Sequence, residues 1–128
     1  MRDSETKAFL LTFRMVGEQE EYRAADPAFI YGPGGYMIAG GVGGDSRAGV
    51  AFGFSATLGN GTHLVHYYPD NWPQLQWQFT TSEGELRFAS GGSMVIETDA
   101  TMTYAKGSFS FDFNDGSRAT GEFDLIRP

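Results

Sequence analysis

The chain contains no cysteine, and basic residues are few: nine lysines and arginines stand against 16 acidic residues, for a formal charge of -7. The absence of cysteine excludes disulfides, thiolate metal sites and a cysteine nucleophile, but it assigns no compartment. The basic residues are scattered rather than gathered into a stripe that could neutralise phosphates. Nucleic-acid binding is therefore not expected, whereas a basic protein partner is compatible with the acidic surface.

Long apolar runs are also missing. The first apolar stretch, residues 8–16, is too short to span a membrane, is broken by Thr12 and Arg14, and follows acidic residues instead of the basic region of a signal peptide. The sequence therefore predicts a soluble chain without membrane insertion. We expect it to be cytoplasmic as given, or an exported domain from which a leader has been removed.

No long helical pattern is present, whereas the chain has 18 glycines, 11 phenylalanines and six tyrosines. This composition favours many short strands joined by tight turns. The length suits one domain with a core of its own. We expect a single all-β domain over residues 1–128, an antiparallel β-sandwich or flattened β-barrel of eight to nine strands with little helix.

The most informative segment is residues 106–125. Phe109, Phe111 and Phe113 alternate with polar residues, which is the period of a strand with one buried face. A three-residue loop, residues 114–116, with Gly116 in the left-handed conformation keeps every aromatic side chain of the hairpin on one face. The expected pairs are Phe109 with Gly121, Phe111 with Ala119 and Gly107 with Phe123 inside, and Asp112 with Arg118 and Lys106 with Asp124 outside.

The first half of the chain is less regular. Alternation over residues 9–16 predicts a central or well-covered first strand, and Pro27 confines residues 22–31 to an edge strand or loop. Nine of the 22 residues in 32–53 are glycine. Tight turns and positions opposite large aromatics explain these glycines better than close approach to a ligand, and two strands turning at residues 43–46 are expected.

Three further registers follow from turn chemistry and strand parity. A two-residue Asn60-Gly61 turn would place Val65 against Ala56 and Tyr67 against Phe54. A three-residue loop would instead turn Leu64, His66 and Tyr68 inward. A two-residue Glu83-Gly84 turn would place Phe79 opposite Phe88. A bulge at Lys106-Gly107 would bring Met102 and Tyr104 into phase with the phenylalanines that follow.

Chemical motifs are sparse. His63 and His66 are three residues apart on a strand and should point to opposite faces; His66, Tyr68 and Asp70 could share one face. A solvent-facing histidine beside a loop is the commoner case. The sequence contains no GxSxG elbow and no calcium-binding loop, and turn chemistry or surface ion pairs account for its paired carboxylates. The sequence therefore favours binding over catalysis and calls for no metal or cofactor.

The best candidate for a ligand-binding site is an aromatic loop that begins at the end of a predicted strand. Tyrosine and tryptophan give large contact areas at low entropic cost, so exposed rings beside Asp and Asn could stack on a sugar or hold a protein partner. The alternative is that Trp72 closes one end of the sandwich. The candidate residues are His66, Tyr67, Tyr68, Asp70, Asn71, Trp72 and the nearby Trp77.

The end of the chain, GGSMVIETDATMTYAKGSFSFDFNDGSRATGEFDL, resembles the closing strands of small bacterial envelope-associated β-sandwich domains of unknown function. In these domains a strand, a turn and a glycine-phenylalanine strand precede a GxFD ending. The resemblance implies a sandwich and an exported or surface role, and it offers no catalytic residues.

Three functions are compatible with these patterns. The first is a non-catalytic binding module that recognises a protein or carbohydrate ligand through the aromatic loop. The second is an acidic inhibitor or immunity-type protein that blocks a basic protein partner. The third is a calycin-like barrel that binds a small apolar ligand in a cavity lined by Phe52, Phe54, Tyr67 and Trp77.

Overall fold

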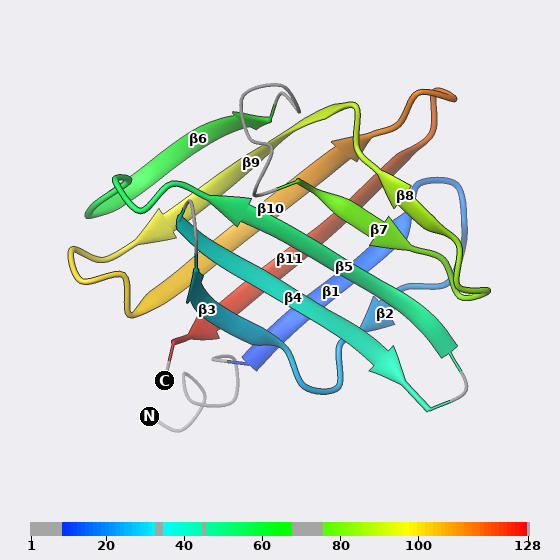
Figure 1. Cartoon of the computed structure of the whole chain (residues 1–128), viewed down its shortest axis with the longest axis horizontal. Helices are drawn as coiled ribbons and strands as arrows, with labels where there is room; N and C mark the ends of the chain where they lie inside the picture. Colours follow the sequence, from blue (N-terminus) through cyan, green and yellow to red (C-terminus); the bar gives the residue numbers. More distant parts are fainter. Residues whose placement is uncertain (1–8, 33–34, 45, 68–75, 128) are drawn as a thin grey trace.

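Two antiparallel sheets make up the molecule (Figure 1). The structure is a computed structural model that describes residues 9–32, 35–44, 46–67 and 76–127. Sheet A has the strand order β2-β1-β11-β10-β9-β6, and sheet B has the order β3-β4-β5-β7-β8. In Figure 1, β4 and β5 of sheet B cross in front of β11 and β1 of sheet A, so the strands of the two layers run in different directions.

The strands of sheet A are β1 (Phe9–Met15), β2 (Tyr22–Arg23), β6 (Gly61–Tyr67), β9 (Gly91–Thr98), β10 (Tyr104–Asp112) and β11 (Arg118–Ile126). Those of sheet B are β3 (Ala28–Gly32), β4 (Gly35–Gly43), β5 (Ser46–Phe54), β7 (Gln78–Thr80) and β8 (Leu86–Phe88).

The expected all-β antiparallel fold is confirmed, and its form is a sandwich rather than a closed barrel. The described residues form 11 strands where eight to nine were expected, and β2, β7 and β8 are only two or three residues long. Pro27 separates β2 from β3, and each of these strands is the edge of its sheet, as the proline predicts. In the described part of the chain, no helix is long and apolar enough to cross a membrane.

The core is a layer of aromatic and aliphatic side chains between the sheets. Each fully buried side chain of this size adds roughly 1.5–3 kcal/mol to the stability of the fold. The largest of them are Leu11, Phe13, Ile38, Phe52, Phe54, Tyr67, Trp77, Phe79, Met94, Ile96, Phe111 and Phe123.

The β10–β11 hairpin has the register that its sequence predicts. Phe113 and Ser117 close the three-residue loop, with the Ser117 carbonyl accepting from the Phe113 amide at 3.0 Å. Gly116 has a φ of 88°, in the left-handed region. The two outer pairs, Asp112 with Arg118 and Lys106 with Asp124, lie in register, and Arg118 Nε donates to Asp112 Oδ1 at 2.8 Å.

The predicted Asn60-Gly61 hairpin is wrong. β5 and β6 lie in different sheets, and β6 pairs with β9, where Val65 is opposite Met94 and Tyr67 is opposite Gly92. Residues 55–60 therefore cross from one sheet to the other. Contacts from sheet A hold this crossing, because the Gly59 carbonyl accepts from the Thr98 hydroxyl and lies 3.2 Å from His63 Nε2.

The predicted register of β7 and β8 is wrong by one residue. Thr81 and Glu85 close a three-residue loop, residues 82–84, with Gly84 at a φ of 93°. Phe79 is therefore opposite Arg87 instead of Phe88. As a result Leu86 and Phe88 point outward, and they are 50% and 53% exposed. This loop is of the same kind as residues 114–116 and carries glycine at the same position.

The predicted bulge at Lys106-Gly107 is also wrong, because β10 pairs without interruption with both β9 and β11. The phase changes earlier, at the buried Met102, whose φ is 57°. Asp99 supports this turn by accepting hydrogen bonds from the Thr103 amide at 2.7 Å and the Tyr104 amide at 3.4 Å.

Gly121 is expected to tolerate no side chain. A methyl group there would overlap the Phe109 ring and the carbonyl oxygen of Thr12. We expect Gly121→Ala to lower the free energy of unfolding by about 2–3 kcal/mol, the cost of overpacking a core. Gly32→Ala is the matched control, because nothing lies within 4 Å of the added methyl group. Urea denaturation of both variants measures the difference, and equal stabilities would contradict the prediction.

Candidate functional site

The predicted aromatic loop lies largely outside the described residues. Tyr68, Asp70, Asn71 and Trp72 belong to the undescribed segment 68–75. Of the other candidates, His66 is exposed on the outer face of β6, opposite Ser93. The described part of the chain contains no group of three or more His, Asp or Glu side chains placed to hold a metal ion.

Tyr67 and Trp77 are core residues rather than surface residues. They are 2% and 1% exposed, and their rings are stacked with centroids 4.7 Å apart and an interplanar angle of 10°. Trp77 Nε1 donates to the Gly53 carbonyl at 2.9 Å, which satisfies the buried indole N–H. Tyr67 and Trp77 flank residues 68–76 in the sequence. Their stacked rings therefore connect the end of β6 in sheet A with the start of β7 in sheet B.

The phenol of Tyr67 is buried without a hydrogen bond of ordinary geometry to the described residues. Burial raises the pKa of this phenol, and a contact with the Trp77 main chain offsets the rise only in part. A buried hydroxyl that has lost its water without gaining a strong partner costs stability.

The calycin-like alternative requires an interior cavity. The four side chains expected to line it pack against their neighbours, with Phe52 and Trp77 6.3 Å apart and Trp77 and Phe111 5.2 Å apart between centroids. Phe54 lies 6.1 Å from Tyr36 in a stacked arrangement. The two open sheets are not the closed barrel that the calycin-like alternative requires, and binding of a small apolar ligand stays a prediction.

A depression of about 240 Å³ lies where the connection after β1 meets the β7–β8 hairpin. We call it the acidic pocket. Met15 and Phe79 are buried beneath it, and Tyr22 stacks on Phe13 beside it at 5.6 Å. Its lining residues are Met15, Glu18, Tyr22, Phe79, Thr81, Ser82, Glu83, Glu85 and Arg87.

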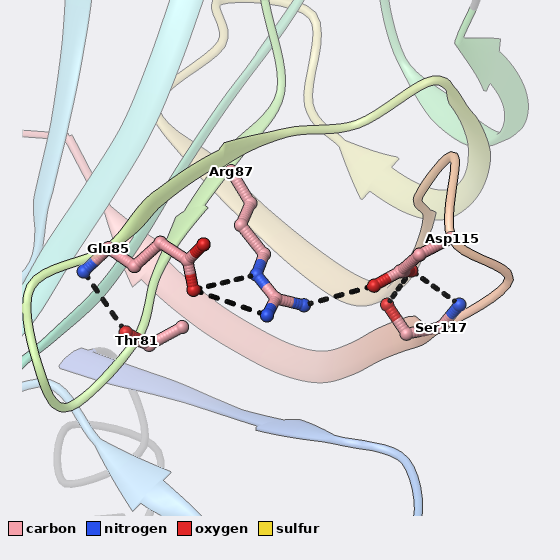
Figure 2. Close-up of polar contacts among 5 residues, drawn as sticks. All are labelled: Thr81, Glu85, Arg87, Asp115 and Ser117. Atoms are coloured by element: carbon pink, nitrogen blue, oxygen red, sulfur yellow. Dashed lines mark hydrogen bonds and ion pairs between the residues drawn. The ribbon is translucent and has the colours of Figure 1, made fainter.

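Arg87 links Glu85 and Asp115 at this end of the molecule, as Figure 2 shows. We call these three residues the Arg87 network. Its guanidinium contacts Glu85 Oε1 at 3.2 Å on one side and Asp115 Oδ2 at 3.6 Å on the other. The Glu85 amide donates to Thr81 Oγ1 at 3.0 Å, and Asp115 Oδ1 accepts from the Ser117 amide at 2.9 Å. The β7–β8 hairpin of sheet B is thus linked to the β10–β11 turn of sheet A.

The exposure of these groups limits what the network contributes to stability. The Glu85 and Asp115 side chains are 63% and 61% exposed, and ion pairs of this kind add about 1 kcal/mol or less. Hydrogen bonds from the hydroxyl and amide of Ser117 lower the pKa of Asp115, with a smaller contribution from Arg87. The network therefore orients the pocket wall more than it stabilises the fold.

The pocket is negative at its rim and apolar at its base. Arg87 is paired with Glu85 and Asp115, whereas neither Glu18 nor Glu83 makes an ion pair within the described ranges. Such a site suits an amphipathic cation, because a lysine or arginine side chain can lay its methylene stem on apolar groups and place its charge among carboxylates. The lining contains hydroxyl groups but no histidine that could act as a base for them.

Sequence reasoning assigned Glu83 and Glu85 to turn chemistry and did not select Arg87. The two-residue turn placed Phe88 opposite Phe79 and left Arg87 without a role. The signal that could have identified it is Ser82-Glu83-Gly84, which has glycine third, as does the loop at residues 114–116. A three-residue loop there brings Arg87 opposite Phe79, at the edge of the pocket.

Comparison with protein-family models, curated proteins and solved structures gives no match for this chain.

The Tyr67→Phe variant tests whether the buried phenol has a hydrogen-bond partner. Because the hydroxyl makes no ordinary hydrogen bond to the described residues, we expect its removal to leave the free energy of unfolding unchanged or to raise it by about 1 kcal/mol. Thermal and urea denaturation provide the measurement, with Tyr22→Phe as the matched control at a partly buried ring. A loss of more than about 1 kcal/mol would show that the hydroxyl is hydrogen-bonded.

Proposed function

We propose that the protein is a non-catalytic binding protein that recognises a basic protein surface through the acidic pocket. The observation that carries this proposal is the pairing of an apolar base with the carboxylates of Glu18, Glu83 and Glu85 in one depression. A lysine or arginine side chain of a partner matches both parts. The net charge of -7 adds attraction at longer range and speeds the encounter.

The Arg87 network supports the same proposal by pre-organising the pocket. It links two turns that belong to different sheets, so Glu85 is held in one orientation before a partner arrives. A wall that is ordered in advance lowers the entropic cost of binding. This function corresponds to that of an inhibitor or immunity-type protein that covers a basic partner.

Neutralising the two unpaired glutamates tests the proposal. A phage-displayed library of random short peptides serves as the probe, and we expect the wild-type protein to enrich peptides with lysine or arginine. Affinity for a selected peptide should fall at least tenfold in Glu18→Gln/Glu83→Gln, because two charges that face the bound cation are lost. It should also weaken as sodium chloride is raised from about 0.05 to about 0.5 M.

The matched control is Glu97→Gln/Glu122→Gln, which removes the same total charge from the outer face of sheet A. If binding depends on the pocket, this control should keep most of its affinity. Enrichment without basic residues, or equal losses in the two double variants, would overturn the proposal.

A second candidate function is recognition of a protein or carbohydrate through residues 68–72. The stacked pair of Tyr67 and Trp77 favours it, because these two packed rings flank that stretch in the sequence and fix both of its ends. Trp72 and Trp77 are the only two tryptophans in the chain. Since Trp77 is buried, Trp72 is the ring to test as a binding group.

Trp72→Ala separates binding from structure. For a binding role we expect the melting temperature to fall by less than about 3 °C, while binding on arrays of oligosaccharides and peptides is lost. The control is Trp77→Phe, which removes the hydrogen bond to Gly53 and should lower the melting temperature while preserving binding. A large fall in the melting temperature of Trp72→Ala would show a structural role and end this candidate.

A further inference from the structure

The Asn60-Gly61 pair does not form the predicted hairpin, but it has a reactivity of its own. The chain contains three asparagines, and only Asn60 precedes a glycine; the other two precede Trp72 and Asp115. Asparagine is one of the thermolabile residues of proteins, because the main-chain amide that follows it can attack its side chain. Glycine has no side chain to obstruct this attack. Asn60 is therefore the asparagine of this chain that is most open to spontaneous modification.

The structure leaves the Asn60 side chain free to move. It is exposed, and it makes no hydrogen bond with the described residues. Both of its neighbours are glycines with positive φ, 74° at Gly59 and 115° at Gly61. Nothing lies within 4 Å of a methyl group built on either glycine. The side-chain amide of Asn60 can thus turn toward the main chain of Gly61 without displacing a neighbour.

Thr98 holds the main chain on both sides of Asn60. The Thr98 side chain is 1% exposed, and its hydroxyl donates to the Gly59 carbonyl. Gly61 lies opposite Thr98 as the first pair of the β6–β9 ladder. The terminal pair of a ladder opens more readily than the pairs inside it, so the Gly61 amide is released from time to time. Asn60 is therefore the exposed middle of a short segment that is anchored at both ends.

The Asp115-Gly116 pair has the same spacing without this freedom. Asp115 Oδ1 accepts from the Ser117 amide at 2.9 Å, and Oδ2 contacts the Arg87 guanidinium at 3.6 Å. The Gly116 amide donates to the Phe113 carbonyl at 3.0 Å. Hydrogen bonds from Ser117 lower the pKa of Asp115, so this group stays ionised, and a carboxylate resists nucleophilic attack. The fold thus protects the Asp-Gly pair and leaves the Asn-Gly pair open.

The reaction at an open Asn-Gly pair needs only water. The amide nitrogen of Gly61 loses its proton to a base and attacks the side-chain carbonyl carbon of Asn60. A new C–N bond closes a cyclic imide, while the bond to the side-chain nitrogen breaks and this nitrogen takes up a proton and leaves as ammonia. Water then adds to one of the two imide carbonyls and opens the ring. One opening gives aspartate, and the other gives isoaspartate.

The two products differ in their effect on the anchored segment. Both add a negative charge, but aspartate leaves the main chain unchanged. Isoaspartate routes the main chain through the former side chain, which inserts one carbon atom between Gly59 and Gly61. Thr98 can then no longer keep both its hydrogen bond to Gly59 and its position opposite Gly61.

We propose that Asn60 is a site of spontaneous deamidation, and that its isoaspartyl product weakens the attachment of the crossing, residues 55–60, to sheet A.

Peptide mapping by mass spectrometry tests the site. The folded protein is incubated for several weeks at mildly acidic and mildly alkaline pH, and the conversion of each asparagine to acid is measured. We expect Asn60 to react at least about tenfold faster than Asn114, because glycine leaves the attacking nitrogen unobstructed. The rate should rise with pH, since this nitrogen must lose its proton. A faster reaction at Asn114 would overturn the proposal.

A synthetic peptide of residues 58–62 is the reference for the unfolded chain. Because the fold leaves Asn60 exposed and unbonded, the folded protein should react within about tenfold of the peptide rate. A peptide that reacts while Asn60 of the folded protein stays intact would show that the fold protects the pair, which contradicts the proposal. Isomerisation at Asp115 should be slower than the reaction at Asn60 in the folded protein and should accelerate in urea.

Melting temperatures separate the two products. The Asn60→Asp variant reproduces the aspartyl product, and the isoaspartyl form is purified from incubated wild-type protein. We expect Asn60→Asp to melt within about 1 °C of the wild type, and the isoaspartyl form about 3 °C or more below it, as the loss of one or two hydrogen bonds implies. Equal melting temperatures for Asn60→Asp and the isoaspartyl form would contradict a weakened crossing.

The matched control is Asn60→Gln, which keeps the amide but moves it one methylene further from the main chain, so that ring closure is slow. This variant should fold like the wild type, because the side chain at position 60 is exposed. It should also keep its melting temperature through the incubation. A fall in the melting temperature of incubated Asn60→Gln that equals the fall in the wild type would place the damage at another residue and end the proposal.

Discussion

Ring packing around Phe52 is the interaction on which the rest of the structure depends. Its centroid lies 4.8 Å from that of Phe109 and 5.3 Å from that of Phe123, so one ring of sheet B contacts two rings of sheet A. Rings of this size fit between two sheets only where small residues lie opposite them, as Gly121 does for Phe109. The positions of glycine and phenylalanine along the strands therefore depend on each other, because each large ring needs a small residue opposite it.

The same layer determines which aromatic residues remain for the surface. Trp77 continues the core from Phe111 to Tyr67, and it spans the gap between the end of β6 and the start of β7. Tyr67 and Trp77 therefore cannot serve as exposed binding groups. Their stacking holds the two sheets together at that point.

Outside the core, the two sheets differ in chemistry. Sheet A carries a mixed set of charges on its outer face, the acidic pocket offers carboxylates above an apolar base, and the strands of sheet B carry only two charged residues, Arg47 and Arg87. The acidic pocket therefore suits a cationic group.

Strand alternation and local turn chemistry were sufficient to predict the fold class and the β10–β11 hairpin, because both depend on neighbouring residues. They failed where a choice depended on distant residues, since β6 pairs with β9 instead of β5. The three-residue loop that brings Arg87 toward Asp115 had a local signal, glycine at its third position, which the two-residue interpretation did not use. Segment 68–75 lies outside the described residues, so the role of Trp72 stays a prediction. The sequence by itself determined which residues of the β10–β11 hairpin face inward, since alternation is local. Only the tertiary structure decided which strands meet and which outer face lacks charge, because pairing across sheets depends on how the whole core packs.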